Sequence, residues 1–141
     1  MENLNLSDYI KINQKKAFEI IYRIDLYPEF VPGYKHVRLI EKRETYLKVE
    51  ITPTIPIKNI VMEALLTPYE TIKFNQISGP LDTFKGIWHI EEVEKEVVKV
   101  DFFLQYYVKN FLLRKLVYKF VKISFKDIIA AFKIRAEQLG G

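Results

Sequence analysis

The residues whose types could perform acid–base or metal chemistry are few and far apart. His36 and His89 are the two histidines of the 141-residue chain, and cysteine is absent. Neither histidine forms a metal-spaced pair with a nearby carboxylate, and there is no nucleophile elbow, phosphate loop or dinucleotide fingerprint. We therefore expect no metal site and no catalytic residue, and we interpret the chain as a binding protein rather than an enzyme.

Two polar residues stand out near the C-terminus. The segment from Phe111 to Leu139 contains neither Gly nor Pro, and its periodicity predicts one long amphipathic helix. Ser124 and Arg135 fall inside its apolar sector. An arginine there is costly unless it is paired, and Asp25 or Asp127 is the expected partner. A structural ion pair is one interpretation, and a hydrogen bond from Arg135 or Ser124 to a ligand carbonyl is the other.

Five lysines fall within a narrow stripe of the same predicted helix: Lys115, Lys119, Lys122, Lys126 and Lys133. Such a stripe is typical of the solvated face of an amphipathic helix. It would also suit the phosphates of ribosomal RNA or anionic lipid headgroups. No RNA-binding motif accompanies it, so these interpretations remain alternatives.

The rest of the chain must supply the elements that position these side chains. We expect a short strand over Ser7–Ile12, a helix over Gln14–Ile24 capped by Asn13, and a turn or single-turn helix over Glu29–Gly33. Alternating residues and intervening prolines then predict six strands: Val37–Lys42, Tyr46–Thr52, Ile57–Leu66, Thr71–Ile77, Phe84–Val93 and Val97–Tyr107. Because a sheet with one apolar face must be covered, the C-terminal helix is the expected cover.

The composition fits one α+β domain over residues 1–141. Hydrophobic residues make up 49% and charged residues 28% of the chain, and the formal net charge is +4. This mildly basic balance gives no reason to expect a DNA partner. The first residues do not resemble a signal peptide and no apolar run reaches about 18 residues, so we expect a cytoplasmic protein. A peripheral position at the inner membrane is the alternative.

Three motifs resemble those of the coenzyme Q-binding proteins and their bacterial relatives, within the START-like polyketide cyclase group. The segment DLYPEFVP at 25–32 is similar to the family's D-x-Y-P-x-F-V-P. GPL at 79–81 and GIW at 86–88 resemble its G-P-[FL] and G-x-W elements. AFKIRA at 131–136 looks like the A-F-x-x-R-A end of its last helix. The resemblance extends from Tyr9 to Leu139.

This resemblance implies the helix-grip fold. That fold is a curved antiparallel sheet of about seven strands wrapped on a long C-terminal helix, with a short helical pair after the first strand and a deep apolar cavity. Close relatives bind ubiquinone or another polyisoprenoid quinone or lipid, or associate with the large ribosomal subunit as toxins. We take non-catalytic binding of such a ligand as the leading hypothesis, ribosome association as the alternative and a cyclase-like enzyme as the second alternative. No other cofactor is expected, and the oligomeric state is not predicted.

The expected ligand contacts lie where the sheet and the helix face each other. They are Phe30, Val49, Met62, Phe74, Trp88, Phe102, Leu104, Tyr106, Val117, Phe120, Val121, Ser124 and Ile128. Arg135 and Asp25 are candidate polar anchors, for example for a quinone head. Tyr27, Val31, Ile55 and Ile57 are candidates for a portal or a membrane contact. For each of these residues, packing in the core is the structural alternative.

Overall fold

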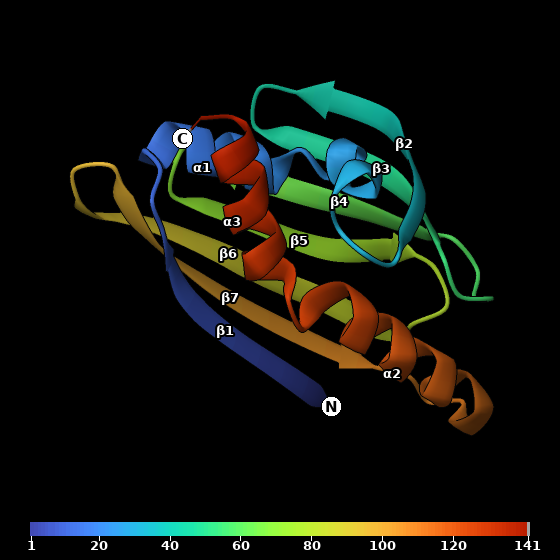
Figure 1. The fold of residues 1–141 in the computed structure, drawn as a ribbon. Coiled ribbons are helices and arrows are strands. Elements are labelled where there is room, and N and C mark those ends of the chain that lie inside the picture. The colour runs from blue at the N-terminus through green and yellow to red at the C-terminus, as the bar shows by residue number, and fades with distance from the viewer. Residues whose placement is uncertain (141) are drawn as a thin grey trace.

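Seven strands form one antiparallel sheet in the order β1-β7-β6-β5-β4-β3-β2. The computed structural model describes residues 1–140. Its strands are β1 Glu2–Ile10, β2 Tyr34–Arg43, β3 Tyr46–Pro53, β4 Ile60–Thr67, β5 Thr71–Ser78, β6 Thr83–Glu94 and β7 Val97–Tyr107. Successive strands from β2 to β7 pair as hairpins, while β1 joins the far edge beside β7. The curved sheet carries all the helices on one face (Figure 1).

The helices are α1 Gln14–Tyr22, the 3-10 helix η1 Ile24–Glu29, α2 Phe111–Phe125 and α3 Ile128–Gln138. Asn13 caps α1 by accepting a hydrogen bond from the Lys16 amide at 2.9 Å, as predicted. Asn110 caps α2 in the same way through the Leu113 amide at 3.0 Å. α1 packs against α3, and η1 packs against β2 (Figure 1). These contacts close the upper part of the sheet's inner face.

The prediction of one long C-terminal helix is wrong. The helix stops after Phe125 and resumes at Ile128, and Asp127 between them has non-helical angles of φ −117° and ψ 26°. Neither Gly nor Pro marks this break. The turn keeps both flanking side chains in the core, since Phe125 is 4% and Ile128 1% exposed. Tertiary packing therefore overrides local helix propensity here.

Several other boundaries differ from the prediction. β1 begins at Glu2 rather than Ser7, because residues from Glu2 onward pair with β7 although apolar and polar residues alternate only weakly there. The short helical turn lies at Ile24–Glu29, upstream of the expected 29–33, and it contains Pro28. The six later strands overlap the predicted segments, but β2 begins three residues earlier, at Tyr34, and β4 three residues later, at Ile60. β3 and β7 alternate between inner and outer residues along nearly their whole length.

No helix within residues 1–140 has the length and apolar character required to span a membrane.

Candidate functional site

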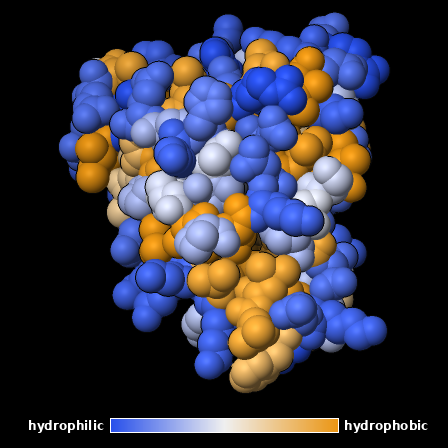
Figure 2. Space-filling view, turned by 90° about the vertical axis from the view of Figure 1, so that its right-hand side faces the viewer, coloured by the Kyte–Doolittle hydropathy of each residue, from blue (hydrophilic) through white to orange (hydrophobic). Residues whose placement is uncertain are grey.

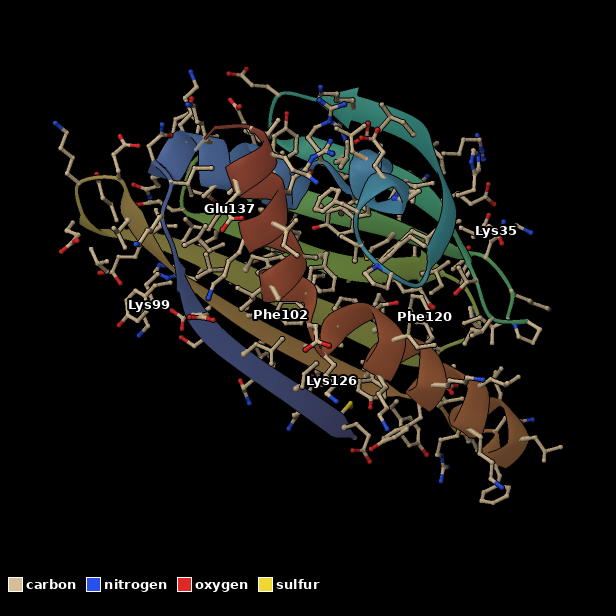
Figure 3. All side chains as sticks on the ribbon, viewed as in Figure 1. Lys35, Lys99, Phe102, Phe120, Lys126 and Glu137 are labelled. Atoms are coloured by element: carbon tan, nitrogen blue, oxygen red, sulfur yellow. The ribbon has the colours of Figure 1, made fainter. Side chains whose placement is uncertain are left out.

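Aromatic side chains fill the space between the sheet and the C-terminal helices. Phe102 on β7 stacks on Phe74 of β5 with ring centroids 6.0 Å apart, and on Phe125 of α2 at 5.4 Å. The ring of Trp88 on β6 lies 4.1 Å from the ring of Phe102, centroid to centroid. Phe132 of α3 packs edge-on against Trp88 at 5.2 Å. Figure 3 shows Phe102 beneath these helices. α2 and α3 therefore pack against the sheet through contacts between aromatic rings.

A small cavity among the core side chains has a volume of only about 10 Å³. That volume suits about one water molecule. Its lining comprises Ile21, Ile24, Tyr27, Tyr34, Met62, Ile72, Phe74, Trp88, Phe125 and Ile128. In this structure, side chains occupy most of the space in which the resemblance implies a deep apolar cavity. The chain's many phenylalanines fill the interior instead of bordering an open space.

The structure distributes the predicted ligand contacts over four places. Met62, Phe74, Trp88 and Ile128 line the small cavity. Other members are buried without bordering it: Val49, Phe102, Leu104, Val117, Phe120 and Ser124. Phe30 lines an outer cleft, while Tyr106 and Val121 line a groove between β1 and α2.

Sequence reasoning missed several residues of the cavity lining: Ile21, Ile24, Tyr34, Ile72 and Phe125. Tyr34 was missed because β2 begins directly after the Pro32-Gly33 breaker, ahead of the predicted Val37. Ile21 and Ile24 could have been predicted as lining residues, since both lie on the apolar face predicted for the first helix.

Several hydroxyl groups lie in the buried interior. The Tyr27 hydroxyl donates to the backbone carbonyl of Ile21. Burial raises the pKa of Tyr27 well above its usual value and also raises the pKa of Tyr34, so both phenols stay neutral near neutral pH. Ser124 is 1% exposed, and its Oγ has no hydrogen-bond partner within residues 1–140. The interior can therefore offer neutral hydrogen bonds, with Ser124 Oγ unused.

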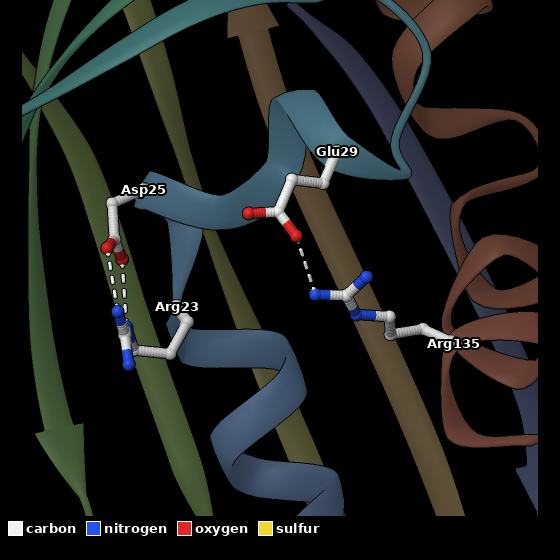
Figure 4. A network of polar contacts seen from close by, with 4 residues as sticks. All are labelled: Arg23, Asp25, Glu29 and Arg135. Atoms are coloured by element: carbon white, nitrogen blue, oxygen red, sulfur yellow. Dashed lines mark hydrogen bonds and ion pairs between the residues drawn. The ribbon is translucent and has the colours of Figure 1, made fainter. Parts of the chain in front are cut away.

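The polar anchor candidates form two separate ion pairs at η1 (Figure 4). Asp25 accepts from Arg23 Nε at 3.0 Å and from Nη2 at 2.9 Å, and these hydrogen bonds lower the pKa of the Asp25 carboxyl. Arg135 instead donates from Nη2 to Glu29 at 2.8 Å, with its guanidinium 4.8 Å from the centroid of the Phe30 ring. Pairing of Arg135 with either predicted aspartate is therefore wrong. η1 begins earlier than expected, which turns Asp25 back toward the end of α1.

The expected portal residues do not form an exposed apolar surface. Tyr27 and Val31 are each 3% exposed and Ile55 is 9% exposed, while Ile57 is half-buried. A hydrogen bond of 3.0 Å from the Thr54 amide to the Gly33 carbonyl ties the two proline-containing segments together. These segments fold onto the core, and a portal or membrane contact through these side chains stays a prediction.

The outer face of α2 is basic. Lys115, Lys119, Lys122 and Lys126 are exposed and form no ion pair within the described part of the chain. No acidic residue occurs between Asn110 and Lys126. Lys133 does not continue this stripe as predicted, because the break before α3 redirects it to Asp8 at 2.6 Å.

Large apolar side chains accompany these lysines. Phe111, Leu112 and Tyr118 are 63%, 76% and 58% exposed. The first turn of α2 projects beyond the sheet in Figure 1, and Figure 2 shows hydrophobic side chains gathered at that end. The Lys115 ammonium lies 5.2 Å from the centroid of the Phe111 ring. The exposed half of α2 is thus both cationic and aromatic.

Comparison with known proteins places this arrangement in a family. The model of the family described as polyketide cyclase/dehydrase and lipid transport matches residues 10–133. The ribosome association toxin RatA of Vibrio cholerae is 22% identical over 143 residues, covering 100% of this chain and 99% of the relative. RatA of Escherichia coli K12 is 20% identical, covering 99% of this chain and 89% of the relative.

Solved structures share the fold at low identity. The ZhuI aromatase/cyclase from a Streptomyces species superposes with a TM-score of 0.87 at 13% identity, over 99% of this chain and 96% of that one. An 18 kDa protein from Caulobacter crescentus superposes with a TM-score of 0.77 at 21% identity, over 100% and 99% of the two chains. The chain therefore belongs to the polyketide cyclase/dehydrase and lipid transport family and has its START-like helix-grip fold.

Proposed function

We propose that this protein associates with the ribosome through the outer face of α2. The observation that carries the proposal is the set of four exposed lysines at Lys115, Lys119, Lys122 and Lys126, without an acidic residue among them. Cations placed in this way neutralise RNA phosphates and release their counterions. The names of the curated relatives, ribosome association toxins, support the same partner.

The aromatic residues of α2 add a second kind of contact. Phe111 and Tyr118 are more than half exposed beside the lysines. Exposed rings stack on unpaired bases, which are plentiful in the loops of folded RNA. A surface with both features binds RNA more selectively than charge alone.

Co-sedimentation with purified ribosomal subunits tests this proposal. Lys119→Glu with Lys122→Glu is expected to remove binding to the large subunit. Lys73→Glu with Lys85→Glu makes the same change in net charge at exposed positions of β5 and β6, and is expected to retain binding. Equal loss in both variants would indicate nonspecific attraction. Binding to anionic vesicles without binding to ribosomes would overturn the proposal in favour of a membrane partner.

A hydrophobic ligand in the interior is the second candidate, favoured by one observation. Ser124 Oγ is buried without a partner, at the end of α2 beside the helix break. If α2 and α3 move apart at Asp127, the rings of Phe125 and Phe132 would withdraw from Phe102 and Trp88. A polyisoprenoid quinone or related lipid would fill that space, and Ser124 would donate to its carbonyl.

Trp88 lines the small cavity and is the chain's single tryptophan, so it reports on this second candidate. Decylubiquinone is expected to quench its fluorescence in a saturable way, and mass spectrometry of extracts is expected to find stoichiometric quinone. Unchanged fluorescence together with a lipid-free protein would contradict interior binding. We propose no catalytic step, because the buried residues of 1–140 offer hydroxyls but no carboxylate or imidazole.

A further inference from the structure

A cleft of about 340 Å³ opens on the surface between α1, η1 and α3. Its lining consists of Lys16, Glu19, Ile20, Arg23, Leu26, Phe30, Arg135 and Leu139. The ring of Phe30 separates this cleft from the interior by packing on Tyr27 at 5.8 Å and Phe132 at 6.0 Å. The volume and the mixture of apolar walls with a few polar groups are typical of small-molecule sites.

The polar side of the cleft is cationic. Three basic side chains, Lys16, Arg23 and Arg135, face the single carboxylate of Glu19 in the lining. Lys16 is exposed and has no ion pair within residues 1–140. Asp25 and Glu29 balance the charges of the two arginines, so an anion in the cleft would be held by Lys16 and by arginine N–H groups that the ion pairs leave free.

Both arginines retain hydrogen-bond donors. A guanidinium carries five N–H groups. Arg135 uses Nη2 on Glu29, and Arg23 uses Nε and Nη2 on Asp25. Their other N–H groups have no partner within the described residues, and Glu29 and Asp25 already hold the two side chains in place (Figure 4). Guanidinium groups held in place in this way suit a carboxylate, which can accept two hydrogen bonds from one guanidinium.

The apolar side of the cleft suits a short hydrocarbon chain. Ile20, Leu26 and Phe30 form a wall, and Leu139 is 57% exposed at the rim. A volume of 340 Å³ corresponds to roughly ten non-hydrogen atoms at about 30 Å³ each. This is the size of a medium-chain carboxylate.

We propose that this cleft binds an amphiphile with a carboxylate head, a medium-chain fatty acid in its simplest form. The head lies at Arg135, with Lys16 and Arg23 contributing, and the chain lies along Ile20, Leu26 and Leu139. The site is separate from the basic outer face of α2, and it does not depend on ribosome association.

Calorimetric titration with fatty carboxylates of increasing length tests the proposal. Affinity is expected to rise about fourfold for each CH₂ added, and to level off near decanoate, when the cleft is full. Decanol, which lacks the charge, is expected to bind at least tenfold more weakly. Absence of decanoate binding at millimolar concentration, or equal affinity for decanol, would overturn the proposal.

Matched variants locate the site. Lys16→Gln is expected to weaken decanoate binding about two- to fivefold, whereas Lys15→Gln, on the neighbouring exposed lysine outside the lining, is expected to leave it unchanged. Arg135→Gln is expected to weaken binding about tenfold or more. Equal affinity across all three variants would overturn the assignment.

Spectroscopy separates the cleft from the interior. Decanoate is expected to shift the backbone amide resonances of Leu26 and Leu139 while leaving the fluorescence of Trp88 unchanged. A fluorescence change without shifts at those two amides would place the ligand in the interior and overturn the cleft proposal.

Discussion

Gly33 lies against Ser124 of α2, so the segment before β2 passes close to the helix at this point. Gly33 has a φ of +94°, and a Cβ added there would overlap Ser124 Oγ and lie 3.2 Å from Ser124 Cβ. Left-handed backbone costs an L-residue about 1–2 kcal/mol. Overpacking adds about 1–3 kcal/mol, since the helix or the loop must shift. Gly33→Ala is therefore expected to lower the free energy of unfolding by about 2–5 kcal/mol.

Ser124→Ala removes the atom that causes the overlap. Because that hydroxyl is buried without a partner in residues 1–140, its removal alone is expected to raise the free energy of unfolding by about 1 kcal/mol. In the double variant the backbone strain and the contact between the two Cβ atoms remain, but the overlap with Oγ disappears. The free energy of unfolding of the double variant should therefore exceed the value expected from adding the two single effects by about 1–3 kcal/mol.

Urea denaturation followed by Trp88 fluorescence measures these free energies, since Trp88 is 3% exposed in the core. Gly140→Ala is the control, because Gly140 also has a positive φ of +71° but nothing within 4 Å of an added Cβ. It should show no coupling to Ser124→Ala. Effects of Gly33→Ala and Ser124→Ala that add to within about 0.5 kcal/mol would refute the overlap argument.

Two further predictions concern the ion pair at η1 and the aromatic interior. The pKa of Asp25 is lowered by its hydrogen bonds from Arg23, so its stabilisation is present above the unfolded pKa of about 3.9 and is lost as the pH falls through the lower folded pKa. Asp25→Asn should reduce the melting temperature at neutral pH and flatten its fall in acid, and an unchanged acid profile would count against this role. Phe102→Ala should lower the free energy of unfolding by about 3–5 kcal/mol in urea titrations, whereas a loss below about 1 kcal/mol would show that the ring stack is not a central part of the core.

The fold was predictable because strands and turns leave local signals. The alternation of Leu47, Val49 and Ile51 marks β3, and the same alternation marks β7. Asn13 marks the start of α1 through its capping hydrogen bond. The break at Asp127 has no such signal, because it depends on the packing of both helices against the curved sheet.

The candidate sites were predictable only in part. Helical periodicity correctly placed Lys119 and Lys122 on the exposed face of α2. It misplaced Lys133, since a helix break turns every later side chain relative to the earlier ones. Periodicity also indicates which side chains point inward, but it does not indicate whether opposing rings meet. The contact of Phe102 with Phe125, which fills the interior, is a property of three-dimensional packing.

The salt dependence of binding to the large ribosomal subunit tests the central claim most directly. With four lysines on phosphates, the logarithm of the association constant should fall with the logarithm of salt concentration with a slope of about −2.8 to −3.6, which is a loss of roughly 50- to 150-fold between 50 and 200 mM salt. Lys119→Gln with Lys122→Gln should reduce the slope by about two. An unchanged slope in this variant, or no measurable binding by the wild-type protein at low salt, would contradict ribosome association through α2.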